Sequence, residues 1–186
     1  MKFVKLISIV LLFTASISGC VPSIPGAGGQ SQALTINDVS PELASATALN
    51  PFKTEQNPEG QVVNYQVFGI EQVDAFSKSS AKLLGMVLVA EKMRDVAANF
   101  GEGLEVGSFN DATKLGEGVL TFARQVVEQA QALQTQGQEL VGNVASIASD
   151  KPMMVPAITS ELTSSIERIA DALSRATALV SGGESE

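Results

Sequence analysis

The 186-residue chain contains no histidine, no tryptophan and a single cysteine, Cys20. These absences exclude histidine-based catalytic triads, histidine metal sites and disulfide bonds within the chain. Charged residues make up only 17% of the chain, and its 12 basic and 20 acidic residues leave a net charge of −8. Nucleic acid repels that charge, so we expect no nucleic-acid partner. A hydrophobic share of 45%, in contrast, is high enough for a folded domain with a core.

The first twenty residues have the layout of a secretory signal peptide. Two lysines precede a short apolar run, residues 6–13, which is too short for a transmembrane helix of about 20 apolar residues. The run Ile-Ser-Gly-Cys at residues 17–20 resembles the lipobox of bacterial lipoproteins. This resemblance implies that residues 1–19 are a cleaved signal peptide and that Cys20 is acylated.

The lipoprotein resemblance also implies a location in the bacterial cell envelope. The protein would be held at a membrane by the acyl chains on Cys20, because two or more chains anchor a protein firmly. Val21 follows the cysteine, whereas an aspartate there is the usual signal for retention in the inner membrane. In a Gram-negative cell we therefore expect the outer membrane. Cleavage removes both N-terminal lysines, so the mature chain carries 10 basic and 20 acidic residues.

Residues 20–34 are predicted to form the lipidated cysteine and a flexible tether. Residues 21–34 contain three glycines, two prolines and no charged residue, a composition typical of flexible linkers. The remainder, residues 35–186, is predicted to be a single helical-bundle domain. A short helix is expected first, with Ser40 as its N-cap, Pro41 at its first position and Asn50 before the proline that stops it.

The stretch Val62–Phe68 alternates apolar and polar residues, which favours a strand. No second strand is evident in the sequence to pair with it. Three interpretations remain open: an extended segment lying across helices, an early start of the first long helix, or an edge that pairs with another chain. Tyr65 and Phe68 are aromatic residues outside the long helices, so they are our candidate contacts for a protein partner.

From Gly69 onward the chain predicts three long helices, over residues 70–100, 109–148 and 156–181. Each has apolar residues at steps of three and four, and short connections make neighbouring helices antiparallel. The uncharged run Leu83–Ala90 places the first long helix in the middle of the assembly. Gly137 lies on the apolar stripe of the second, which marks either a close crossing or a weak point. Glu161 and Arg168 fall outside the stripe of the third.

The expected fold class is therefore all-α. We expect an elongated antiparallel three-helix bundle with a short extra N-terminal helix and, if residues 62–68 are extended, a lone extended segment. The loop residue Lys151 is expected to contribute little to stability.

The sequence predicts no catalytic residue, no metal and no cofactor. The usual nucleophile–base pairs are missing, although composition alone leaves serine–lysine chemistry open because serines lie beside Lys78 and Lys82. Met86 and Met93 are expected to fill the core rather than to bind copper, and the pair Met153-Met154 to pack the end of the bundle.

We therefore expect a lipid-anchored, non-enzymatic adaptor or structural subunit of a membrane-associated protein assembly. The alternative is a helical carrier or binding module for an apolar ligand. That alternative is suggested by small residues that could leave space between the helices, including Ala81, Gly85, Ala90, Gly116 and Ala123.

Overall fold

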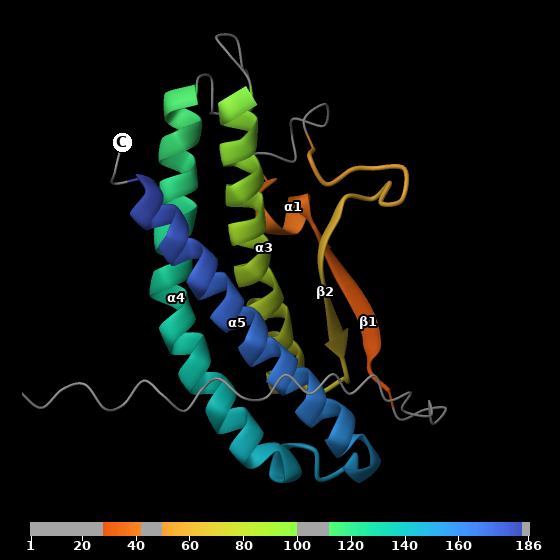
Figure 1. Ribbon diagram of the computed structural model, residues 1–186. Coiled ribbons are helices and arrows are strands. Elements are labelled where there is room, and N and C mark those ends of the chain that lie inside the picture. Colours follow the sequence, from red (N-terminus) through yellow and green to blue (C-terminus); the bar gives the residue numbers. More distant parts are fainter. Residues whose placement is uncertain (1–27, 42–49, 100–111, 184–186) are drawn as a thin grey trace, which may run out of the picture.

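A computed structural model describes residues 28–41, 50–99 and 112–183 of the chain (Figure 1). The described part is mostly helical and contains a two-stranded sheet. In chain order its elements are strand β1 (Gln30–Thr35), helix α1 (Ile36–Val39), strand β2 (Gln61–Val67), helix α3 (Glu71–Asn99), helix α4 (Ala112–Ile147), the 3₁₀ turn η2 (Pro152–Met154) and helix α5 (Val155–Gly183).

Three long helices make up most of the fold, as the apolar periodicity predicts. Each of α3, α4 and α5 contacts the other two, and successive helices run in opposite directions (Figure 1). The first and last residues of α3 lie within one residue of the predicted bounds, and those of α5 lie within two. The predicted start of α4 at residue 109 lies outside the described residues. Apolar residues at steps of three and four run along each helix, which explains this agreement.

Helix α3 is the central helix, which confirms the prediction from its uncharged middle. It contacts α4 and α5 as well as α1 and both strands. In Figure 1 the sheet and α1 lie on one side of α3, α4 lies on the other side, and α5 runs obliquely across the lower half of α3. Leu83, Val87 and Ala90 are at most 1% exposed. A helix that is apolar on several sides must be covered on several sides, and here helices and the sheet share that task.

The alternating stretch forms strand β2, as its pattern predicts, but it is not a lone extended segment. Strand β2 pairs antiparallel with β1, and Gln32 lies opposite Tyr65. Strand β1, Gln30–Thr35, therefore lies almost entirely in the segment that is predicted to be a flexible tether. Strand β1 reads Gln-Ser-Gln-Ala-Leu-Thr, and its first three residues are exposed while Leu34 is buried. The composition of β1 is as polar as that of a linker, so its sequence does not indicate a strand. Only its pairing with β2 shows that it is one.

Of the three interpretations of residues 62–68, the extended segment lying across helices agrees with the structure, because β2 is extended and packs on α3. Helix α3 begins only at Glu71, so the first long helix does not start early. The ladder with β1 lies within the chain, so a second chain does not supply that pairing. Strand β2 packs mainly on the central helix α3. It is held there because its buried face continues the apolar surface that α3 presents.

Helix α1 is a single turn that follows β1 directly in the sequence and packs on α3. The carboxylate of Asp38 accepts hydrogen bonds from the backbone N–H and the hydroxyl of Thr35, both at 2.8 Å. The backbone hydrogen bond is the main cause that holds the pKa of Asp38 below its ordinary value of 3.8. Because its pKa is lowered, the ionised Asp38 carboxylate stabilises the fold. This stabilisation is fully present above pH 3.8 and is lost as the pH falls through the lowered pKa.

Val39 of α1 docks against Gly85 of α3. A Cβ atom at Gly85 would lie 2.8 Å from a methyl carbon of Val39, so the glycine makes room for this contact. The helix predicted from Ser40 to Asn50 falls largely on residues 42–49, which lie outside the described residues. Ser40 itself follows the last residue of α1 and is buried.

The turn from β2 into α3 is held by two charged side chains. The carboxylate of Asp74 accepts hydrogen bonds from the backbone N–H groups of Phe68 (2.7 Å), Gly69 (2.9 Å) and Ile70 (3.1 Å). The ammonium of Lys151 donates to the carbonyl oxygens of Phe68 (2.7 Å) and Gly69 (3.1 Å). Lys151 thus ties the α4–α5 connection to this turn, which corrects the expectation that it contributes little.

Candidate functional site

Five polar side chains are gathered inside the fold, and we call them the buried polar cluster. Ser77 and Ser80 come from α3, and Glu161, Ser165 and Arg168 come from α5. The three serines are 0% exposed and Glu161 is 7% exposed. The α5 members are spaced four and three residues apart, so they share one face of the helix. That face meets α3 although Glu161 and Arg168 fall outside the apolar stripe.

The guanidinium of Arg168 organises the cluster. It pairs with the carboxylate of Glu161 and donates to the hydroxyls of Ser165 at 2.7 Å, Ser80 at 3.2 Å and Ser77 at 3.3 Å. Ser77 also donates its hydroxyl hydrogen to Glu161. These bonds join α3 to α5 and give each buried charge a partner, as a low-dielectric interior requires.

The backbone N–H of Gln66 lies 3.4 Å from the same Glu161 carboxylate oxygen, so strand β2 reaches the cluster as well. The serine hydroxyls face this interior, whereas Lys78 and Lys82 are exposed on other faces of α3. Ser77 and Ser80 are therefore bonded to α5 rather than to the lysines beside them in sequence. With its two charges paired and its serines buried, the cluster ties α5 to α3.

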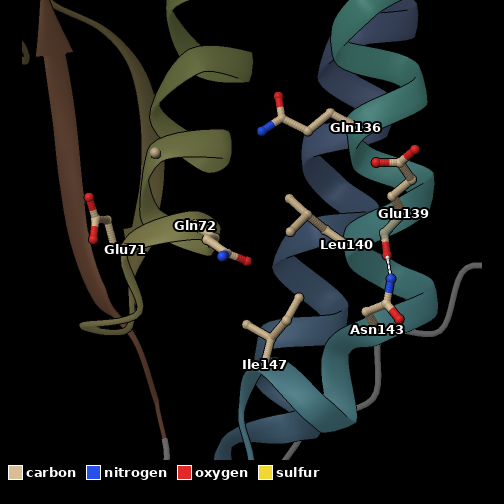
Figure 2. A pocket seen from close by; sticks show the side chains of 8 residues that line it. Glu71, Gln72, Gln136, Glu139, Leu140, Asn143 and Ile147 are labelled. Atoms are coloured by element: carbon tan, nitrogen blue, oxygen red, sulfur yellow. Dashed lines mark hydrogen bonds between the residues drawn. The ribbon is translucent and has the colours of Figure 1, made fainter.

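The surface carries a groove of about 720 Å³ between the first turns of α3 and the last third of α4 (Figure 2). We call it the α3–α4 groove. Figure 2 shows Leu140 and Ile147 of α4 pointing toward α3, with Gln136 one turn further along. It is lined by Glu71, Gln72, Ala75, Gln136, Glu139, Leu140, Asn143 and Ile147.

The chemistry of the α3–α4 groove is mixed. Leu140 is 7% exposed and supplies an apolar base, while three amide side chains and two carboxylates border it. The amide of Asn143 already donates to the carbonyl of Glu139 at 2.9 Å. A smaller groove of about 280 Å³ continues along the same two helices, between Leu83 and Leu133. The lining of the α3–α4 groove can hold an apolar side chain and hydrogen-bond a peptide backbone, and its charged residues, Glu71 and Glu139, are both acidic.

The candidate partner contacts Tyr65 and Phe68 are buried instead. They are 9% and 4% exposed and belong to the core. A Cβ atom at Gly29, next to the start of β1, would lie 2.8 Å from the ring of Phe68, so the chain entering β1 covers that side chain. The expectation that these two aromatics face a partner is therefore wrong, because pairing with β1 and packing on α3 enclose them. Cys20 lies outside the described residues.

The methionines divide between core and surface. Met86 and Met93 are 6% and 2% exposed, which confirms that they fill the core. Met154 packs partly against the core. Met153 is 73% exposed, so the expectation that both members of this pair pack the end of the helices is wrong for Met153. The sequence offered no indication of the α3–α4 groove, which depends on the faces that two distant segments leave uncovered.

Within the described ranges, no three or more cysteine, aspartate or glutamate side chains come together where they could hold a metal ion. Among the same residues, no helix combines the length and the apolarity that crossing a membrane requires. No protein-family model, curated protein or solved structure matches this chain.

Proposed function

We propose that the protein is a lipid-anchored, non-enzymatic adaptor or structural subunit of a protein assembly in the bacterial cell envelope. The lipobox-like run ending at Cys20 supports the anchor, and Val21 favours the outer membrane if the cell is Gram-negative. In this proposal the helices form an elongated antiparallel three-helix bundle, reinforced by the sheet, that presents a surface to a protein partner.

The α3–α4 groove is the observation that carries the adaptor proposal. It lies on the outside of two long helices and combines apolar, amide and carboxylate side chains. Side chains of this mixture can take up one apolar residue of a partner and hydrogen-bond its backbone. Glu71 and Glu139 make the groove acidic, so the fitting partner is a peptide segment or helix with basic residues beside an apolar one.

The packing of the small residues supports an adaptor over a carrier of apolar ligands. Ala81, Ala90 and Ala123 are 0% exposed, and Val39 fills the space over Gly85. These positions are therefore closed by neighbouring atoms. A carrier needs an apolar cavity between its helices, whereas an adaptor needs a firm body with an accessible surface. Gly116 is the exception among the suggested residues, because the space over it is open.

Photocrosslinking in intact cells tests the proposed partner surface. A photoreactive amino acid at Gln136 lies in the groove, and the same substitution at Gln131 provides a matched control on an exposed part of α4. The two positions are five residues apart, which turns them about 140° from each other around the helix. We expect adducts with one or a few proteins from position 136 and none of these from position 131.

The crosslinking result would count against the proposal in two cases. One is a protein that crosslinks from position 136 only to itself while remaining folded and at the membrane. The other is the same set of adducts from both positions, because this would mean collision rather than binding in the groove.

A further inference from the structure

The turn η2 and the first two residues of α5 form an apolar tip on the molecule, which we call the α4–α5 tip. Its five residues, Pro152–Pro156, read Pro-Met-Met-Val-Pro and carry no charge, and they follow the charged residues Asp150 and Lys151. Met153 is 73% exposed, and within the described residues it is the one large apolar side chain that is exposed. Pro152 and Pro156 are exposed as well. Exposed apolar side chains gathered at one end of a protein mark a contact with a membrane or with another protein.

The chain coming from Cys20 enters the fold at the same end. Strand β1 begins near the lower end of Figure 1, where the α4–α5 connection also lies. Contacts through Phe68 join the start of β1 to the α4–α5 connection. Gly29, next to the start of β1, lies against the ring of Phe68. The carbonyl of Phe68 accepts a hydrogen bond from Lys151 at 2.7 Å. Lys151 directly precedes the tip.

Covalent length limits how far this end can stand from the anchor. The eight residues from Cys20 to Ala27 span at most about 29 Å when fully extended. Helix α4, with 36 residues, is about 54 Å long. The anchoring membrane is therefore within reach of the tip end, whereas this length of chain is shorter than α4 and does not extend to the opposite end of the helices.

We propose that the α4–α5 tip dips into the lipid surface to which Cys20 is attached, so that the body stands on the membrane by two contacts. This inference rests on the proposed function through the anchor at Cys20. Methionine is a flexible apolar side chain that adapts to an irregular surface such as the head-group boundary. The ammonium of Lys151 is already held by two carbonyl groups, and the net negative charge of the mature chain disfavours lying flat on anionic lipid.

A fluorescent label at the tip tests the contact in the complete, acylated protein. The chain has one cysteine, Cys20, and acylation blocks its thiol, so Met153→Cys introduces the only thiol that can react. An environment-sensitive dye is attached there and the protein is placed in vesicles of phosphatidylethanolamine and phosphatidylglycerol. Ser181→Cys, near the far end of α5, is the matched control. We expect blue-shifted emission and about twofold or greater quenching by nitroxides on the acyl chains at position 153 only.

Labels at positions 153 and 181 that respond equally to the nitroxide lipids would overturn the tip contact. A blue shift at position 153 without lipid quenching would also overturn it, because it would indicate a second copy of the chain as the occupant. Dye uptake by the protein without an added cysteine would show that Cys20 is free, which overturns the anchor itself. The failure of the tip contact and the failure of the proposed function are therefore separate results.

Discussion

At the scale of single residues, two arginines of α5 occupy opposite environments. Arg168 has a side chain that is 15% exposed and pairs with Glu161, whose side chain is 8% exposed. Arg175 is 42% exposed and bridges Asp171 at 2.9 Å and Glu91 of α3 at 3.0 Å. Hydrogen bonds to Asp171 and then to Glu91 raise the pKa of Arg175 above its ordinary value. Both arginines link α5 to α3, but the loss of the buried Arg168 should reduce stability more than the loss of the exposed Arg175.

The first prediction compares Arg168→Met with Arg175→Met. Removing Arg168 leaves the Glu161 carboxylate buried without its ionic partner, which costs about 3–5 kcal/mol of unfolding free energy. Removing Arg175 breaks solvent-exposed pairs, which costs about 0–1 kcal/mol. Urea unfolding followed by circular dichroism measures both losses.

A second substitution separates the buried charge from the packing of Arg168. Adding Glu161→Leu to Arg168→Met removes the unpaired charge, so the double variant is expected to recover most of the lost stability. Equal stability of the two single arginine variants would contradict the role assigned to the buried polar cluster. So would a double variant no more stable than Arg168→Met.

At the scale of elements, Gly137 sets the crossing of α4 with its two neighbours. A Cβ atom there would lie 2.6 Å from the ring of Phe76 on α3 and 2.8 Å from Ile166 on α5. Of the two interpretations that the sequence leaves open, the close crossing is therefore confirmed. Gly142 lies five residues later on the same helix, and nothing lies within 4 Å of a Cβ atom there.

The second prediction uses these two glycines as a pair. Gly142→Ala removes a flexible residue from an exposed helical position and should stabilise the protein by about 1 kcal/mol. Gly137→Ala brings the same gain in helix propensity, but its methyl group forces the buried Phe76 and the partly buried Ile166 to move. Overpacking of this kind costs about 1–3 kcal/mol, so the net effect is a loss.

Thermal unfolding of both alanine variants provides the measurement for this prediction. We expect the melting temperature to rise for Gly142→Ala and to fall for Gly137→Ala. Stabilisation by both substitutions would mean that α4 does not cross its neighbours closely at Gly137.

At the scale of the whole molecule, the proposal combines a membrane anchor, a helical body and a groove for a partner. The anchor is the part that sequence alone supports, through the lipobox-like residues 17–20. Acyl chains each contribute about 0.8 kcal/mol per buried methylene group, so the modified cysteine should dominate membrane attachment. The apolar tip at Met153 is then an additional contact rather than a substitute for the anchor.

The third prediction is therefore that Cys20→Ser abolishes membrane attachment. Cells grown with a labelled fatty acid should incorporate label into the wild-type protein and into a Ser23→Ala control, but not into Cys20→Ser. Centrifugation of cell extracts should leave only the Cys20→Ser protein in the soluble fraction. A Cys20→Ser protein that still takes up fatty acid and still pellets with membranes would contradict the anchor.

Local apolar spacing was enough to predict the three long helices and the interior of the central one, but not the short helix α1. Apolar spacing is a local property, so the limits of α3 and α5 and the burial of Leu83 and Met86 follow from residues close together in the chain. Tertiary structure alone decided the rest. Polar β1 becomes a strand by pairing with β2, about thirty residues later. Glu161 is buried because Ser77, 84 residues away, lies opposite it, and the α3–α4 groove exists because no described element covers both helices there. Each of these depends on contacts between distant residues, which periodicity along one segment does not encode.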